Sequence, residues 1–322
     1  MKPKVLVTRE TFPDVLEYLA RHFDVTSNQS DVPFEPEALA SALADKDGAL
    51  TALTDRIDAA VLAKCARLKA VCNIAVGYNN IDVAACSARG VMVTNTPGVL
   101  DDSTADFTMA LLLASARRLT EAEAWLRAGE WKGWKLIQFL GHDVHRSTLG
   151  ILGMGRIGQA VARRARGFDM KVIYHNKSRL DPAVERTHNA AYVTFDDLLA
   201  QSDFLTIHVP YSAATHHVIG AAQLARMKPS AYLINTARGG VVDDAALIAV
   251  LREKRLAGAG LDVYENEPKL NPEFLNLKNV VLAPHIASCT EVTRHKMAML
   301  AAENLVAALT TGKPPNWLNP PT

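Results

Sequence analysis

The segment that most constrains the fold of this chain is TLGILGMGRIGQAVARRARGFDMKVIYH, residues 148–175. It predicts an apolar strand, a glycine-rich turn, an amphipathic helix and a second strand, which together form a parallel βαβ unit. Gly153, Gly155 and Gly158 have the G-x-G-x-x-G spacing, which allows a tight turn, close approach of a pyrophosphate and close helix packing. The helix begins at Arg156 and Ile157, whose free N–H groups can bind a phosphate group. We therefore predict that this segment binds a dinucleotide.

The residues after the second strand indicate which dinucleotide is bound. In NAD sites, an acidic residue about 20 residues past the glycine motif binds the ribose 2′-hydroxyl. Here the matching positions are Asn176, Lys177, Ser178 and Arg179, which suit a 2′-phosphate because they offer charge-assisted hydrogen bonds and no repelling carboxylate. The sequence thus predicts NADPH as the cofactor. An alternative is that Asp181 reaches back to the ribose, in which case NADH would serve.

Short apolar runs alternate with helical segments along the whole chain, which predicts an α/β fold with parallel sheets. A chain of 322 residues that is 49% hydrophobic is long enough for two domains. In chain order the expected strands are 4–8, 24–27, 48–53, 70–74 and 91–96, then 148–153, 171–175, 191–194, 203–209, 231–237, 257–263 and 280–284. The two series predict two doubly wound, Rossmann-like domains.

Between the two series, residues 101–129 predict one long helix and residues 130–147 an irregular segment. The irregular segment contains EWKGWKLIQFL, which is rich in apolar and aromatic side chains. Such a surface is rarely left uncovered, so it is expected either to pack on its own domain or to contact a second copy of the chain. The tail predicts an amphipathic helix over 291–312, which Gly312 closes.

Charge and cysteine content argue against several classes of function. Thirty-five basic and 34 acidic residues give a net charge of +1 without a basic block, which disfavours nucleic acid and anionic membranes as partners. The four cysteines have no C-x-x-C spacing, so no zinc site, disulfide framework or other metal site is predicted. The basic start MKPKVLVTRE has an apolar run too short for a signal peptide, and we expect a cytoplasmic protein.

Three segments near the end of the second series place polar side chains after predicted strands. They are INTARGG with Arg238, GLDVYENEP with Asp262 and Glu267, and APHIAS with His285. Open α/β sheets bind ligands at the carboxyl ends of their strands. Arg238 could hold a carboxylate through two parallel hydrogen bonds, and His285 could donate a proton if a carboxylate favours its protonated form. Each residue alone also fits an ordinary surface or core position, and the combination is what predicts a catalytic site.

Several of these segments together resemble the D-isomer-specific 2-hydroxyacid dehydrogenase family. GMGRIGQ, INTARGGVVD, AGLDVYENEP and PHIAS occur in the order typical of that family, and VGYNNIDVAACSARGVMVTNTPG extends the match into the first series. Within the family, the chain is most similar to glyoxylate/hydroxypyruvate reductases, including the 2-ketogluconate reductase type. The resemblance implies a substrate-binding domain of residues 1–99 and 288–322. A dinucleotide-binding domain of residues 100–287, with a dimerisation arm, would be inserted into it.

The resemblance also implies roles for individual residues. His285 would protonate the carbonyl oxygen of a 2-oxo acid, Glu267 would hold His285, and Arg238 would bind the substrate. Further substrate contacts are implied for Leu53, Val76, Gly77 and, in a homodimer, Trp134. The cofactor would be contacted by Thr104, Gly153, Gly155, Arg156, Ile157, Gly158, Asn176, Lys177, Ser178, Arg179, Pro210, Thr215, Thr236, Ala237 and Asp262.

The expected activity is NADPH-dependent reduction of glyoxylate, hydroxypyruvate or 2-ketogluconate to the D-2-hydroxy acid. Two alternatives stay open: an NAD-dependent D-2-hydroxyacid dehydrogenase similar to D-lactate dehydrogenase, and a non-catalytic nucleotide sensor on the same fold. A formate dehydrogenase is disfavoured because those enzymes pair the histidine with Gln, where this chain has Glu267. A phosphoglycerate dehydrogenase is disfavoured because 322 residues leave no room for an added regulatory domain.

Overall fold

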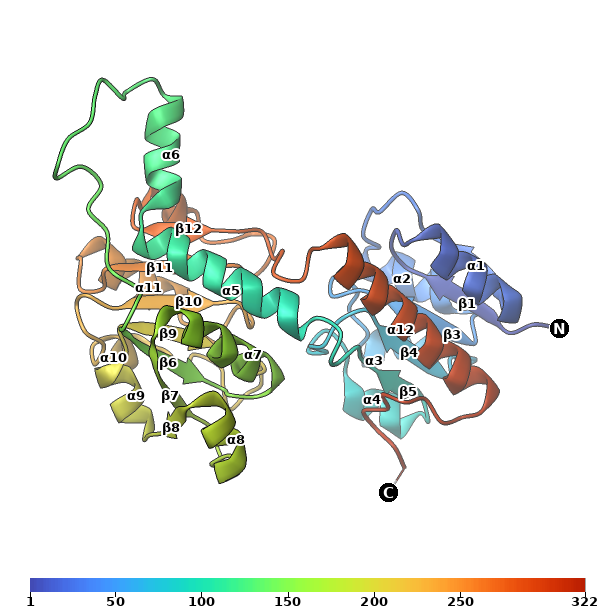
Figure 1. The fold of residues 1–322 in the computed structure, drawn as a ribbon. Coiled ribbons are helices and arrows are strands. Elements are labelled where there is room, and N and C mark those ends of the chain that lie inside the picture. Colours follow the sequence, from blue (N-terminus) through green and yellow to red (C-terminus); the bar gives the residue numbers. More distant parts are fainter. Residues whose placement is uncertain (322) are drawn as a thin grey trace. The chain divides into compact units, whose positions relative to one another are not determined.

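The computed structural model of the chain describes residues 1–321 and divides into two compact units (Figure 1). The first unit is formed by Met1–Leu100 together with the segment from Thr290 onward. The second unit is the continuous segment Asp101–Cys289. The chain therefore leaves the first unit once, forms the whole of the second, and returns.

The first unit is built on a five-stranded sheet in which each strand runs parallel to its neighbours, in the order β2-β1-β3-β4-β5. From β1 the chain adds β2 on one side of the sheet, and from β3 onward it adds strands on the other side. Doubly wound sheets bind ligands at such a point, here between β1 and β3. The strands are β1 (Lys4–Val7), β2 (Asp24–Ser27), β3 (Gly48–Thr51), β4 (Ala70–Asn73) and β5 (Met92–Thr94). The helices are α1 (Pro13–His22), α2 (Pro36–Leu43), α3 (Ala59–Ala63), α4 (Val83–Ala88) and α12 (Glu291–Thr310).

Helices cover both faces of this sheet. Buried apolar side chains of α1 and α12 pack on one face, and those of α2, α3 and α4 pack on the other. Side-chain oxygens of Asp58, Asp82 and Thr290 accept hydrogen bonds at the starts of α3, α4 and α12, where N–H groups lack partners within the helix. Gly312, with a φ of 70°, follows the end of α12, as the sequence predicts.

The second unit contains a seven-stranded sheet, again parallel throughout, in the order β12-β11-β10-β9-β6-β7-β8. The connections change direction between β6 and β9. The strands are β6 (Thr148–Leu152), β7 (Lys171–His175), β8 (Ala190–Tyr192), β9 (Phe204–Ile207), β10 (Tyr232–Asn235), β11 (Gly258–Leu261) and β12 (Val280–Leu282). The helices are α5 (Asp101–Ala116), α6 (Leu119–Arg127), α7 (Arg156–Ala165), α8 (Pro182–His188), α9 (Phe195–Gln201), α10 (Ala221–Leu224) and α11 (Asp244–Arg252), with 3₁₀ turns at Arg166–Phe168 and Pro272–Asn276.

Two apolar clusters enclose this sheet. α5 and α7 pack on one face, and α9, α10 and α11 pack on the other. The predicted fold class, two doubly wound parallel sheets, is confirmed. Several strands end earlier than predicted; β9, for example, ends at Ile207 rather than Val209, because the apolar pattern continues into the loop at the carboxyl edge. No helix within residues 1–321 is long and apolar enough to cross a membrane.

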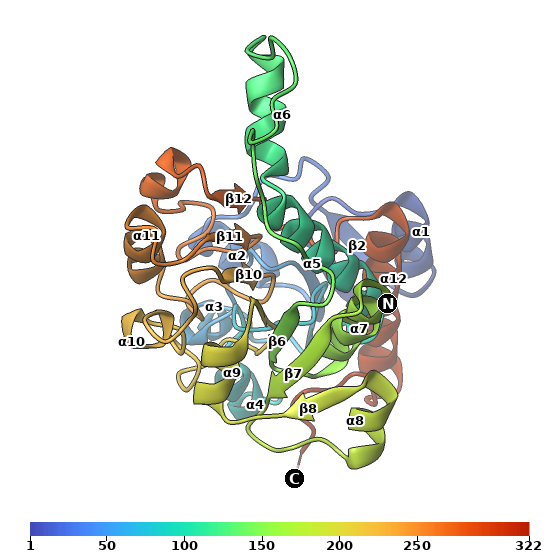
Figure 2. The ribbon, with the colours of Figure 1, turned by 60° about the vertical axis from the view of Figure 1, so that its left-hand side comes forward.

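The prediction of one helix over 101–129 is wrong. The chain forms α5 and α6, and Arg118 between them has a left-handed backbone with a φ of 52°. The Arg118 guanidinium donates to both carboxylate oxygens of Glu121 (2.9 and 3.0 Å), which fixes this turn. α6 and the segment that follows it project from the rest of the second unit (Figures 1 and 2). We call residues 119–141 the arm.

Gly158 gives a direct test of the packing in the second unit. A Cβ at Gly158 would lie 2.6 Å from the carbonyl oxygen of Gly153, whereas a Cβ at Gly155 would meet no atom within 4 Å. Gly158→Ala should lower the free energy of unfolding by about 1–3 kcal/mol because α7 must shift away from the turn. Gly155→Ala should change it by less than about 1 kcal/mol. Urea unfolding followed by circular dichroism measures both, and equal stability of the two variants would contradict the packing described.

Candidate active site

The glycine-rich turn lies at the carboxyl end of β6, where the connections of the second sheet change direction. Gly153 has a φ of 94°, which favours glycine, and its N–H donates to the carbonyl of His175 (3.0 Å). Gly155 begins α7 without a side-chain cap, and the first turn of α7 carries no acidic side chain. The space where a Gly155 Cβ would stand is open. An uncapped helix start beside open space fits the phosphates of a dinucleotide.

His208, directly after β9, packs against this turn and was not singled out from the sequence. A Cβ at Gly153 would lie 2.8 Å from the carbonyl carbon of His208. The His208 Nε2 is buried and has no hydrogen-bond partner among residues 1–321. Burial lowers the pKa of His208 to about 3, so the ring is neutral. An unpaired buried nitrogen costs about 1–3 kcal/mol, and a bound polar group at this edge would remove that cost.

Asn176 and Asp181, after β7, each hold a backbone group. The Asn176 Oδ1 accepts a hydrogen bond from the N–H of Met154 (2.6 Å), so its side chain connects the end of β7 to the glycine-rich turn. The Asp181 Oδ1 accepts one from the N–H of Ala183 (2.7 Å) and caps the start of α8. The alternative in which Asp181 binds a ribose is disfavoured by this role.

The three other predicted residues of this loop differ in their surroundings. Lys177 and Ser178 are exposed. Arg179 forms two hydrogen bonds to the carboxylate of Glu185 (2.8 Å each), which also accepts one from the hydroxyl of Tyr174 (2.7 Å). The hydrogen bonds from Arg179 and Tyr174 lower the pKa of Glu185 to about 2. Arg179 therefore already has a counter-ion, and Lys177 is the better placed of the two basic residues to attract a phosphate.

The structure brings His285 and Glu267 together, as the sequence analysis expects. His285 follows β12 with a φ of 56°, and its Nδ1 lies 2.7 Å from the Glu267 Oε2. The other oxygen of Glu267 accepts from the N–H of Tyr264 (2.8 Å). Burial alone would raise the pKa of Glu267, but the hydrogen bond and charge of His285 outweigh it and hold the pKa below its usual range. The carboxylate is thus ionised and paired with the imidazole at neutral pH.

Asp262, directly after β11, positions the loop that carries His285. It is fully buried, and its two oxygens accept from the N–H groups of Ile286 (2.7 Å) and Ala287 (2.8 Å). Its carbonyl also accepts from the N–H of His285 (2.9 Å). Burial raises the pKa of Asp262, and these N–H groups oppose that shift. Its contacts within the chain are with the His285 loop and with the carbonyl of Asn235, and the expected contact with the cofactor stays a prediction.

Arg238, after β10, lies at the same edge of the sheet. Its Nη1 donates to the carbonyl of Ala237 (2.8 Å), and its own carbonyl accepts from the side chain of Asn235 (3.1 Å). Burial lowers the pKa of Arg238, and the negative charge of Glu267 opposes that shift. A Cβ at Gly239 would overlap the carbonyl oxygen of Tyr264 (1.7 Å), so the chain after Arg238 packs directly on the segment that leads to Glu267. Arg238, Glu267 and His285 therefore gather at one carboxyl edge.

The remaining predicted cofactor residues fall into two connected sets. The Thr215 hydroxyl donates to the carbonyl of Pro210 (2.7 Å), which closes the loop after β9. The buried Thr236 hydroxyl lies 2.8 Å from that of Thr108, which is also 2.8 Å from the carbonyl of Thr104. Thr236 and Thr104 are thus joined through one residue of α5. Ala237 contributes its N–H to the side chain of Asn235 (3.0 Å).

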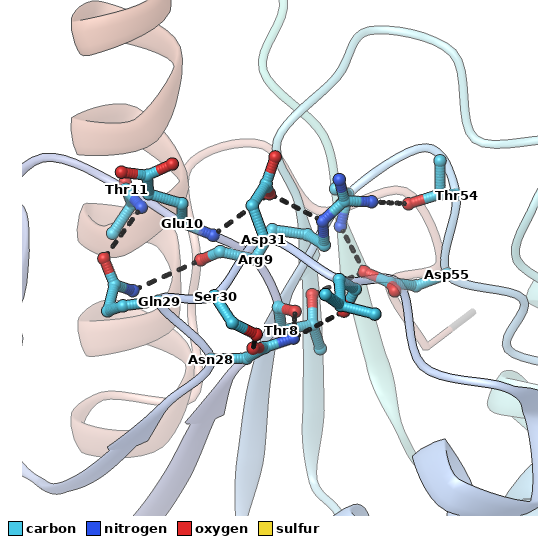
Figure 3. Close-up of polar contacts among 12 residues, drawn as sticks. Thr8, Arg9, Glu10, Thr11, Asn28, Gln29, Ser30, Asp31, Thr54 and Asp55 are labelled. Atoms are coloured by element: carbon cyan, nitrogen blue, oxygen red, sulfur yellow. Dashed lines mark hydrogen bonds and ion pairs between the residues drawn. The ribbon is translucent and has the colours of Figure 1, made fainter.

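The first unit has its own polar cluster at the carboxyl edge, where its connections change direction (Figure 3). The Arg9 guanidinium donates to Asp31 (2.8 Å) and to the hydroxyl of Thr54 (2.6 Å), so it joins the loops after β1, β2 and β3. Below it, the Thr8 hydroxyl contacts the buried carboxylate of Asp55. Arg9 is not among the residues predicted from the sequence, although its position directly after a predicted strand is the same signal that identified Arg238.

The predicted substrate residues of the first unit follow β3 and β4 at this edge. Leu53 is half-buried and precedes Thr54. The carbonyls of Val76 and Gly77 accept from the side chains of Asn95 (2.8 Å) and Asn73 (2.9 Å). Their N–H groups have no acceptor among residues 1–321. The loop is therefore held by its carbonyls and can offer its N–H groups to a carboxylate.

Trp134 lies on the arm, among side chains that contact little of the rest of the unit. Trp134 is 79% exposed, and Leu136 and Ile137 are 75% and 78% exposed. Of the two alternatives, packing on its own domain is seen only locally, where the Phe139 ring packs edge-on against Trp125 of α6 (centroids 5.4 Å apart). The arm thus presents an apolar surface with nothing to cover it within residues 1–321.

Comparison with known proteins finds relatives along the whole chain. A family model described as D-isomer specific 2-hydroxyacid dehydrogenase, NAD binding domain, matches residues 109–287. Glyoxylate reductases of Thermococcus litoralis and Aeropyrum pernix are 47% and 48% identical, over 99% of this chain and 97% and 96% of those proteins. A solved structure of an NADPH-dependent glyoxylate/hydroxypyruvate reductase from Sinorhizobium meliloti, in complex with NADP and malonate, aligns with a TM-score of 0.88. It is 34% identical, with 99% of this chain and 97% of that chain covered.

The role of Asp262 is testable by an isosteric change. Asp262→Asn replaces one acceptor oxygen by a donor group that faces the N–H of Ile286 or Ala287. We expect a loss of about 1–3 kcal/mol in the free energy of unfolding, and faster hydrogen exchange at those two amides. Asp181→Asn is the control, since Asn caps a helix about as well as Asp. Unchanged stability and exchange in Asp262→Asn would show that this carboxylate does not hold the His285 loop.

Proposed function

We propose that this chain, which belongs to the D-isomer-specific 2-hydroxyacid dehydrogenase family, reduces glyoxylate, hydroxypyruvate or 2-ketogluconate with NADPH as the hydride donor. Membership of the family makes it an oxidoreductase of the glyoxylate reductase type and confirms the resemblance inferred from the sequence motifs. The observation that carries the proposal is the His285–Glu267 pair beside Arg238 at one strand edge. An acid, its partner and a carboxylate-binding group are what reduction of a 2-oxo acid requires.

Within this proposal, His285 is the proton donor. Glu267 holds the Nδ1 of His285, which leaves Nε2 for the carbonyl oxygen of the substrate. The ionised Glu267 carboxylate accepts a hydrogen bond from the Nδ1–H of His285, which fixes the orientation of the ring. Proton donation of this kind typically contributes about 10²- to 10⁴-fold in rate. The nicotinamide cofactor, when bound, supplies the hydride to the carbonyl carbon.

We propose that Arg238, in the second unit, binds the substrate carboxylate. Its planar guanidinium matches a carboxylate with two parallel hydrogen bonds, and its partial burial strengthens that attraction. For the first unit, we propose that Leu53 and the N–H groups of Val76 and Gly77 contact the substrate. Their place at the carboxyl edge of that sheet supports this role.

The residues present fit a nicotinamide dinucleotide. The uncapped start of α7, the open space at Gly155 and the unpaired His208 Nε2 together leave room and hydrogen-bonding capacity beside the glycine-rich turn. Preference for NADPH is proposed from the exposed Lys177 and Ser178 and from the absence of a free carboxylate within 176–181, where Asp181 caps α8. The Sinorhizobium meliloti relative, described as NADPH-dependent and solved with NADP, supports the same choice.

The proposed reaction is tested by cofactor oxidation with glyoxylate, hydroxypyruvate, 2-ketogluconate and pyruvate. We expect turnover with at least one of the first three, and a kcat/KM with NADPH at least about tenfold above that with NADH, roughly 1.4 kcal/mol. Equal use of the two cofactors would contradict the NADPH proposal. Turnover of pyruvate with NADH alone would favour the D-lactate-like alternative, and no turnover of any substrate would favour a nucleotide sensor.

Lys177→Gln separates the cofactor preference from the rest of the site. The variant should lose most of the preference for NADPH, because it removes the charge that attracts the 2′-phosphate, and keep its activity with NADH. Lys171→Gln, at the exposed start of β7, is the matched control. Arg179 is less suitable for this test, since its removal would also leave Glu185 without its ion pair.

We also propose that the arm joins two copies of the chain. Its exposed Trp134, Leu136 and Ile137 form an apolar surface of the kind that marks an interaction site, and a homodimer would pair like surfaces. Light scattering should give a mass of about twice 34.9 kDa. Ile137→Asp should shift this mass toward the monomer, whereas Val292→Asp, an exposed apolar position on α12, should not.

Trp134→Ala should change substrate preference more than cofactor affinity. A fully active monomer of the wild type would refute the role of the arm.

A further inference from the structure

Two histidines and a glutamate meet outside the proposed catalytic residues. His216 and His217 lie in the loop between β9 and α10, and Glu265 lies after β11, two residues before Glu267. Each offers one possible ligand atom, and these atoms lie within 4.8 Å of one another. Among residues 1–321, this is the group of His, Cys, Asp or Glu side chains that comes together closely enough to bind a metal ion.

The outer nitrogens of the two rings already have polar neighbours. The Nδ1 of His217 lies 3.9 Å from a carboxylate oxygen of Asp243, while its Nε2 contacts the Oε1 of Glu265. The Nδ1 of His216 lies 3.3 Å from the hydroxyl of Tyr211, which leaves the Nε2 of His216 to bind a metal ion. A histidine that binds a metal usually has its second nitrogen held by a carboxylate or another polar group. His216 meets that condition through Tyr211, whereas the Asp243 carboxylate near His217 lies at 3.9 Å, beyond hydrogen-bond distance.

The backbone holds the ligands in place. The N–H of His217 donates to the carbonyl of Gly240 (2.8 Å), and the N–H of Glu265 donates to a carboxylate oxygen of Asp244 (3.1 Å). The two imidazole rings are stacked, with centroids 3.9 Å apart. The His217 and Glu265 side chains are 35% and 27% exposed, and His216 is exposed. The group is therefore fixed by two loops yet open to solvent, so an ion could enter and keep a water molecule.

We propose that His216, His217 and Glu265 form a binding site for a divalent transition-metal ion of the zinc class. Two imidazole nitrogens and one carboxylate oxygen are ligands that Zn²⁺ accepts, with water in the fourth tetrahedral position. The three side chains are none of those assigned to catalysis, and the proposal does not depend on which reaction the chain performs. The ion would join the loop after β9 to the segment after β11, and so stabilise the second unit.

The experiment measures Zn²⁺ binding to the full chain, after treatment with a chelator, by competition with a chromogenic zinc chelator. We expect one Zn²⁺ per chain. His216→Gln should lower the affinity for Zn²⁺ at least about tenfold, because losing a metal ligand costs no less than losing a group that hydrogen-bonds to a ligand. Since His216 is exposed, this variant should keep its fold, which circular dichroism checks. Zn²⁺ should also raise the unfolding temperature of the wild type but not of His216→Gln.

Two controls make the result specific. His295 also contacts a carboxylate, that of Asp14 (2.6 Å), but it belongs to no metal-binding group within residues 1–321. The His295→Gln variant should therefore bind Zn²⁺ as the wild type does. Cys289→Ser removes the exposed thiol and should also bind normally. Equal affinity in the wild type and His216→Gln, absence of binding to the wild type, or loss of binding in Cys289→Ser would each overturn the proposal.

Discussion

Parallel pairing of the strands is the constraint on which the rest of the structure depends. Because each strand runs the same way as its neighbours, all the carboxyl ends of a sheet meet at one edge, and the residues that follow different strands become neighbours there. The glycine-rich turn, His208, Arg238, Asp262 and the His285 loop belong to five strands of the second unit and reach one edge for this reason. The Arg9 cluster of the first unit arises in the same way.

The carboxyl edge of the sheet brings these residues close together, and backbone contacts then fix the geometry of their side chains. Asp262 holds the loop of His285 through backbone N–H groups, and Tyr264 holds Glu267 through another. Gly239 lets the chain after Arg238 lie against Tyr264 at a distance that no larger residue allows. The ionisable groups therefore depend on buried backbone hydrogen bonds and close packing, and Asp262 acts on His285 through the backbone of its loop rather than through the imidazole.

Patterns of residues close together in the sequence predicted the fold class, the glycine-rich turn and the strand-end positions of Arg238 and His285. Contacts between distant or long side chains were not predictable in that way. The pairing of Arg179 with Glu185 depends on where α8 begins, and the contact of His217 with Glu265 joins residues 48 apart. The break of the long helix at Arg118 also escaped prediction, because its left-handed backbone is fixed by a side-chain contact with Glu121 rather than by a glycine or proline.

The central claim is that His285, held by Glu267, supplies the proton while other residues hold the cofactor. The most direct test is a rapid-mixing measurement of NADPH binding and of the first turnover in His285→Gln, with His145→Gln as an exposed histidine control. The account predicts that His285→Gln binds NADPH like the wild type but oxidises it at least about 100-fold more slowly in the presence of the 2-oxo acid. A first turnover within a few-fold of the wild type, or a comparable loss of NADPH affinity, would contradict the account.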